Sequence, residues 1–115
     1  MINQVVLAGR LTDNVIIYDA GKDSIVANFT LAVNGYNEHT DFIQCTAWNK
    51  LAEILEKFTT KGDKLTIQGR LETGSYEKDG QTHYTAKVVT QNIELPQLKE
   101  KETSKDVRRN TRRRG

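Results

Sequence analysis

The hydrophobic pattern of this 115-residue chain takes a helical period in only one segment, and that segment constrains its fold more than any other feature. Residues 49–61 place four apolar side chains at the spacing of one helix face: Leu51, Ile54, Leu55 and Phe58. The other apolar segments alternate between apolar and polar residues, which is typical of β-strands. The pattern therefore predicts a β-protein with one amphipathic helix in the middle of its sequence.

Five segments show the alternation: residues 4–11, 25–33, 40–48, 64–72 and 82–93. Turn signals separate them, with Asn34-Gly35 and Asp79-Gly80 as the strongest hairpin dipeptides. Asn49 is expected to cap the helix, and Gly62 to follow its end in the left-handed conformation. Three strands, a helix and two strands form the element order of the OB barrel. We therefore expect an all-β, five-stranded OB-fold Greek-key barrel with one helix between strands 3 and 4, while an open α+β sheet remains the alternative.

Charge divides the chain into two regions. Residues 1–96 have nine lysines and arginines against twelve acids, a net charge of −3, whereas residues 97–115 carry +5. We expect 1–96 to form one domain and 97–115 a disordered basic tail that binds nucleic acid through its arginines. A tail that only solubilises the chain, or contacts an acidic protein, is the alternative. The tail arginines are Arg108, Arg109, Arg112, Arg113 and Arg114.

Few residues could support catalysis or bind a metal. Cys45 is the single cysteine and faces the predicted interior, so we expect an inert buried thiol and no disulfide. Cys45, His39 and His83 cannot supply a structural zinc site, and the carboxylates show no metal-binding spacing. We expect neither an enzyme nor a cofactor. No membrane span or export signal is visible, so a cytoplasmic location is predicted.

The third strand carries the clearest functional signal. Its inward residues are small and apolar, whereas the outward face alternates aromatic and polar residues: Phe42, Gln44, Thr46 and Trp48. Such a face is poor core material and suits base stacking. If the strand starts early, Tyr36 joins this face. Phe42 and Trp48 could instead pack under a loop or in a subunit interface.

Cations are predicted to lie beside these aromatic residues. In segment 64–72, Lys64 and Arg70 face away from the core, and Tyr76 shares their parity if no bulge intervenes. Arg10 occupies the outward face of the first strand. Cations that track phosphates beside rings that stack on bases are typical of proteins that bind single strands. Val6 and Ala8 add an apolar outward strip on the first strand, which favours pairing with another copy.

The sequence also resembles the bacterial and phage single-stranded DNA-binding proteins. The matching segments are NQVVLAGRL (3–11), VANFTLAV (26–33), DFIQCTAWNKLAE (41–53), KGDKLTIQGRLETGSY (61–76) and HYTAKVV (83–89). The resemblance implies an OB fold, a homotetramer and binding of single-stranded DNA in replication, recombination and repair. It places the stacking aromatics on Tyr36, Phe42, Trp48 and Tyr76, and family cations on Lys50 and Lys61.

The chain departs from that family at three places. The loop between Val33 and Asp41 is shorter, and Glu72 and Gly74 occupy positions that are commonly basic. The chain ends in RRNTRRRG, whereas cellular members end in an acidic tip that recruits replication proteins. Any replication partner is therefore not expected to bind through such a tip, and a phage or plasmid member is plausible.

Two other functions remain as alternatives. One is an OB accessory protein like the dimeric primosomal replication protein, which differs in the size of its assembly. The other is an OB-barrel nuclease, which needs metal-binding carboxylates with an arginine nearby. Asp13, Asp19 and Asp41 lack that spacing.

Overall fold

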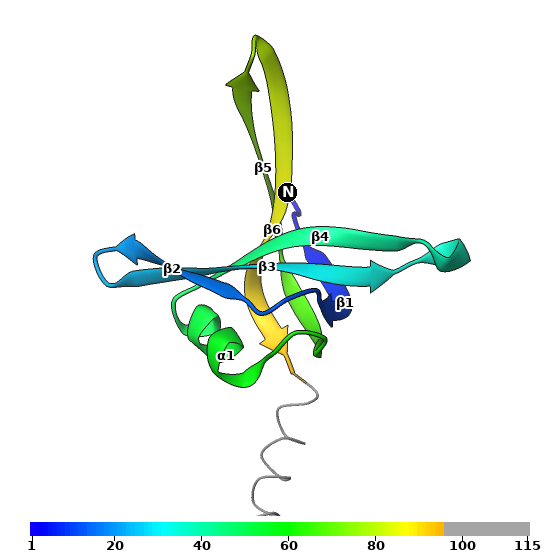
Figure 1. The fold of residues 1–115 in the computed structure, drawn as a ribbon, viewed down its shortest axis with the longest axis vertical. Helices are drawn as coiled ribbons and strands as arrows, with labels where there is room; N and C mark the ends of the chain where they lie inside the picture. Colours follow the sequence, from blue (N-terminus) through cyan, green and yellow to red (C-terminus); the bar gives the residue numbers. More distant parts are fainter. Residues whose placement is uncertain (96–115) are drawn as a thin grey trace, which may run out of the picture.

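The computed structural model describes residues 1–95, which form six strands, one α-helix and a short 3₁₀ turn, η1 (Figure 1). In chain order they are β1 Val5–Leu11, β2 Ile16–Gly21, β3 Ser24–Asn34, η1 Tyr36–Glu38, β4 Thr40–Trp48, α1 Lys50–Phe58, β5 Lys64–Lys78 and β6 Gln81–Glu94. The five predicted strands and the helix are confirmed. Within residues 1–95, no helix is long and apolar enough to cross a membrane.

The strands form a single closed sheet. Its order is β1-β5-β6-β4-β3-β2, and β1 also pairs with β3 where Arg10 lies opposite Ala32. Neighbouring strands are antiparallel except β4 and β6, which pair in parallel at Cys45–Val88. Because β1 reaches both β5 and β3, the sheet closes on itself. The predicted barrel is therefore confirmed, and the open α+β sheet is wrong.

Strand β2 is absent from the sequence-based prediction. It pairs with β3 through a two-residue turn at Lys22 and Asp23, both with positive φ. Only Ile17 of this strand is even half-buried. A strand with so little buried surface gives no clear alternating pattern, which explains why the prediction had five strands. The helix accordingly lies between β4 and β5, which are the third and fourth of the predicted strands.

The core fills the barrel and one of its ends. The predicted inward faces are buried along β3 and β4, and α1 adds Ala52 and Leu55. The full set is Leu11, Ala27, Phe29, Leu31, Cys45, Ala47, Ala52, Leu55, Leu65, Ile67 and Val88. Leu71 shares the alternation of Leu65 and Ile67, which predicts an inward side chain, but it is exposed. Its partner Val88 on β6 is buried, so the inner face of β5 leaves the core at Leu71.

Both predictions for the helix ends need correction. The Asn49 side chain makes no capping bond; its Oδ1 instead accepts a hydrogen bond from the backbone N–H of Ile25, at 3.0 Å. The helix ends earlier than expected, at Phe58, with the N–H of Thr59 donating to the Leu55 carbonyl. Gly62 does adopt a positive φ of 90°, but in the next turn, where its N–H donates to the Leu11 carbonyl.

Strands β5 and β6 continue past the barrel as a long two-stranded arm, which points upward in Figure 1. The arm turns at Asp79-Gly80, as predicted, with positive φ at both residues. The Asn34-Gly35 prediction is only partly confirmed. A hairpin does join β3 to β4, but η1 separates the strands, and Asn37 and Glu38 have the positive φ values.

Candidate nucleic-acid interface

A row of directly paired residues joins an aromatic ring to two cations across four strands. Phe42 of β4 lies opposite Ala32 of β3, Ala32 opposite Arg10 of β1, and Arg10 opposite Lys64 of β5. Directly paired residues project to the same face of a sheet. The Phe42 ring is 65% exposed. The predicted aromatic and cationic positions therefore share one outer face.

Arg10 is held in place by the turn that precedes β5. Its Nη1 donates a hydrogen bond to the Gly62 carbonyl at 3.1 Å. Lys61 is exposed in the same turn, where its backbone N–H donates to Asn14 Oδ1 at 2.8 Å. A shallow groove runs beside Arg10 and is lined by Ala8, Gly9, Arg10, Ala32, Asn34, Lys64 and Thr66. These cations lie along a surface that an extended strand can follow.

A second row places Trp48 beside an aromatic residue that the sequence analysis missed. Trp48 pairs with Val26 of β3, and Val26 pairs with Tyr18 of β2. Trp48 and Tyr18 are 45% and 50% exposed. Phe42 and Trp48 are thus on the surface in this chain, not packed under a loop. Tyr18 was missed because β2 was not predicted, although Ala20-Gly21-Lys22-Asp23 is a turn sequence that could have indicated a hairpin.

A third row carries the same face onto the arm. Asn28 pairs with Thr46, Thr46 with Val89 of β6, and Val89 with Arg70 of β5. Thr46 was expected to be exposed, but it is buried, and its Oγ1 has no hydrogen-bond partner within residues 1–95. It lies mid-sheet between two paired strands. Gln44, nearer the end of the hairpin, is exposed as predicted.

Arg70 and Tyr76 lie on one face of the arm. The register shift near Gly69 inserts its extra residue into β6, so the alternation of β5 continues uninterrupted. Tyr76 lies opposite His83, and their rings stack with centroids 5.1 Å apart and planes 16° from parallel. His83 was not predicted to belong to this face. It is half-buried and supports the Tyr76 ring from β6.

Arg70 faces outward, as predicted, and is paired with a carboxylate. Its Nη2 lies 3.3 Å from Glu72 Oε2, and Lys87 Nζ lies 3.5 Å from Glu72 Oε1. Lys87 of β6 is a second residue of this face that was not among the sequence predictions. One carboxylate thus bridges two cations on the face that carries Tyr76.

The remaining predicted residues lie at the edges of this surface or outside the described chain. Tyr36 is 92% exposed in η1, and β4 begins only at Thr40. The strand parity therefore does not extend to Tyr36. Lys50 is exposed at the first residue of α1. The five tail arginines, from Arg108 to Arg114, lie outside the described residues.

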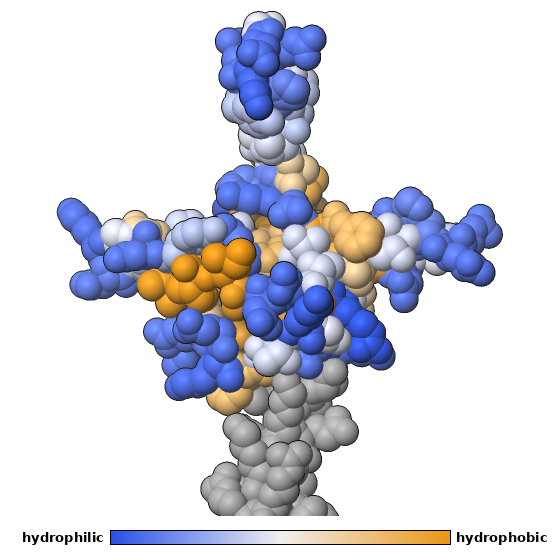
Figure 2. Space-filling view, viewed as in Figure 1, coloured by the Kyte–Doolittle hydropathy of each residue, from blue (hydrophilic) through white to orange (hydrophobic). Residues whose placement is uncertain are grey.

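Figure 2 shows hydrophilic residues covering the projecting ends, with apolar residues gathered between them.

Cys45 is buried, as predicted. It is 2% exposed, and burial raises the pKa of its thiol to about 12. A thiol that keeps its proton at neutral pH is a poor nucleophile. Among residues 1–95, no group of three or more His, Cys, Asp or Glu side chains is placed to hold a metal ion.

Comparison with known proteins agrees with the geometry. The model of the single-strand binding protein family matches residues 2–96. The chain belongs to this family. The match confirms the resemblance found in the sequence, and with it the OB-fold interpretation of the barrel.

Relatives of this chain are named as single-stranded DNA-binding proteins. A "Single-stranded DNA-binding protein" of Clostridium perfringens is 43% identical over 98 residues, covering 82% of this chain and 65% of the relative. "Single-stranded DNA-binding protein 2" of Streptococcus agalactiae is 41% identical, covering 83% of this chain and 77% of the relative. A Staphylococcus epidermidis relative is 33% identical, covering 92% and 86% respectively.

Proposed function

We propose that this protein binds single-stranded DNA without sequence preference and without catalysing a reaction. The observation that carries the proposal is the row that places Phe42 on the same outer face as Arg10 and Lys64. Rings stack on any base, and cations follow the phosphates, so this arrangement does not depend on sequence. Family membership and the names of the relatives support the same function.

The stacking residues in this proposal are Phe42, Trp48 and Tyr76, with Tyr18 extending the surface and Tyr36 reaching in from η1. Arg10, Lys50, Lys61, Lys64 and Arg70 supply the phosphate contacts. The protein would coat single strands exposed during replication, recombination and repair. These processes place its action in the cytoplasm.

Fluorescence of Trp48, the single tryptophan, tests the proposal directly. Poly(dT) should quench its emission, because a base stacked on the indole replaces solvent. Trp48→Ala should weaken binding by about 1–3 kcal/mol, the usual contribution of one stacked base. Since that variant has lost the reporter, its affinity is measured by the polarisation of a labelled oligo(dT).

Tyr84→Ala is the matched control. Like Trp48, Tyr84 is an exposed aromatic residue. It lies on the arm, where it pairs with Ser75 and therefore faces away from Tyr76. We expect its affinity to equal that of the unmodified protein. Unchanged Trp48 emission at saturating poly(dT), or equal losses in both variants, would show that this face does not bind the strand.

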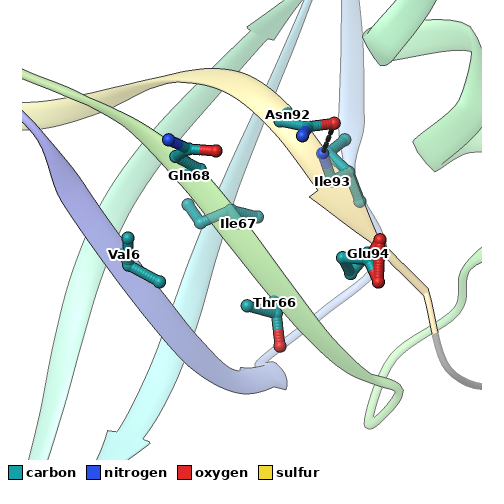
Figure 3. Close-up of a pocket in the computed structure, with 7 residues that line it drawn as sticks. All are labelled: Val6, Thr66, Ile67, Gln68, Asn92, Ile93 and Glu94. Atoms are coloured by element: carbon teal, nitrogen blue, oxygen red, sulfur yellow. Dashed lines mark hydrogen bonds between the residues drawn. The ribbon is translucent and has the colours of Figure 1, made fainter.

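Assembly into a homotetramer is part of the proposal, and the outer face of β1 supports it. Val6 is exposed and pairs with Gln68, which pairs with Asn92. Figure 3 shows Val6 from β1 beside Ile67 of β5 and Ile93 of β6, around a shallow pocket completed by Thr66, Gln68, Asn92 and Glu94. An exposed apolar strip on a strand favours pairing with a second copy. A dimer, as in the accessory-protein alternative, would use the same strip.

The division of the chain is also a proposal. Residues 1–96 would form the DNA-binding domain, and residues 97–115 a basic tail that adds phosphate contacts. The charges support this division, because 1–96 sum to −3 and 97–115 to +5.

A further inference from the structure

One carboxylate on the arm holds two cations that face the same way as Tyr76. Glu72 Oε2 is 3.3 Å from Arg70 Nη2, and Glu72 Oε1 is 3.5 Å from Lys87 Nζ. Glu72 lies directly opposite Lys87, and Arg70 is two residues earlier on β5. Each oxygen of Glu72 therefore faces a different cation. A backbone phosphate presents two anionic oxygens and would meet Arg70 and Lys87 in the same way.

This ion network contributes little to the stability of the fold. The side chains of Arg70, Glu72 and Lys87 are 43%, 42% and 45% exposed. Ion pairs exposed to that degree are screened by water and lose side-chain entropy when they form. The two cations are therefore accessible to an external anion. An anion that replaces Glu72 at these cations should leave the stability of the arm nearly unchanged.

The path along the arm leads from these cations to the stacked rings. Arg70, Glu72, Gly74 and Tyr76 alternate on one face of β5, and Gly74 has no side chain between Glu72 and Tyr76. Its nearest cross-strand side-chain neighbour is Thr85, whose Oγ1 would lie 3.3 Å from an added Cβ. Glu72 and Tyr76 are separated by about 13 Å along the strand. A single strand with a base on Tyr76 can therefore cross Gly74 and place a phosphate at Arg70 and Lys87.

We propose that Arg70 and Lys87 form a binding site for a DNA backbone phosphate, and that Glu72 competes with the phosphate for both cations in the free protein. The inference rests on the proposed function. The competition weakens the phosphate contact, because the DNA strand must displace the Glu72 carboxylate before its phosphate can bind these cations. Replacing Glu72 should therefore strengthen DNA binding.

Glu72→Gln tests the competition, with Glu77→Gln as its control. Both changes remove one negative charge from β5, but Glu77 pairs with Thr82 on the opposite face of the arm. The affinity for labelled oligo(dT) is measured by polarisation over a series of salt concentrations. At low salt we expect Glu72→Gln to bind about threefold more tightly than Glu77→Gln. Its slope of log affinity against log salt should steepen by about 0.7 for the phosphate gained.

A triple variant identifies the cations that produce the gain. Adding Arg70→Met and Lys87→Met to Glu72→Gln should remove both the tighter binding and the steeper slope. If Glu72→Gln and Glu77→Gln bind with the same affinity and slope, or if the gain survives in the triple variant, the phosphate site is wrong. Failure of the unmodified protein to bind oligo(dT) would instead contradict the proposed function itself.

Discussion

Burial in the barrel makes the thiol of one residue, Cys45, a weaker acid. It pairs with Phe29 on β3 and Val88 on β6, and its Sγ lies 3.5 Å from the Ile43 carbonyl. The surrounding wall disfavours the thiolate, so the pKa of the thiol rises to about 12 from an ordinary value of about 8.5. Folding therefore keeps a proton on Cys45 that the unfolded chain loses in mild alkali.

This difference predicts a pH dependence of stability. Below about pH 8.5 the thiol is protonated in both states, and its contribution to folding is fully present. As the pH rises toward 12, only the unfolded state ionises, and the contribution is lost. The urea midpoint should fall more steeply between pH 8.5 and 11 in the natural protein than in Cys45→Ala. Parallel curves would show that Cys45 ionises equally in both states.

Gly69 shows how one position in a strand sets the shape of an element. A Cβ on Gly69 would lie 2.1 Å from the carbonyl oxygen of Val89, which is too close for any side chain. This close approach coincides with the register shift where β6 bulges and the arm leaves the barrel. Glycine at this position therefore allows β5 to serve both as barrel wall and as arm.

Gly69→Ala should consequently destabilise the protein by about 1–3 kcal/mol or more, because the two backbones must move apart. Gly74→Ala provides the comparison within the same strand, since its Cβ would meet only the Thr85 hydroxyl at 3.3 Å. We expect thermal unfolding to show a large loss of stability for Gly69→Ala and little change for Gly74→Ala. Equal melting temperatures for the two variants would contradict the close approach.

Alternation along the strands predicted five of the six strands and most of the candidate interface, but it left the barrel and the open sheet as alternatives. The faces of Phe42 and Trp48 follow from a period of two, which tertiary structure cannot alter within a regular strand. Tyr36 was predicted less well, because the turn in η1 interrupts the period. Tyr18 was not predicted, because it lies on a strand with little buried surface and therefore no clear alternation. The bond between Asn49 and Ile25 joins residues far apart in sequence, and no local pattern encodes it.

At the scale of the whole molecule, the hairpins extend the chain well beyond its barrel. The described residues span 62 × 45 × 32 Å, with the arm along the longest axis (Figure 1). Their radius of gyration is 16.9 Å, against about 12–13 Å for a compact chain of this length. Such projecting ends enlarge the surface available to a strand or to a second copy without enlarging the core.

Assembly is predicted to depend on the outer face of β1. Light scattering at micromolar concentration should give four times the 13.0 kDa mass of one chain. Val6→Lys should reduce that mass, because a charge in an apolar contact must be desolvated. Ile16→Lys, on the exposed strand β2, should leave it unchanged. A monomer from the natural protein, or equal dissociation in both variants, would contradict assembly through β1.

The pairing of β1 with β5 has a consequence for the order in which the chain folds. It joins Val5 to Gly69 and Arg10 to Lys64, residues that are 64 and 54 positions apart in the sequence. The hairpin at Asp79-Gly80, by contrast, joins neighbours in sequence and can form within about 1–10 μs. Closing the long loop costs entropy before its contacts form, and such non-local pairing slows folding. We therefore expect the hairpins to form early and the closure of the barrel to set the folding rate.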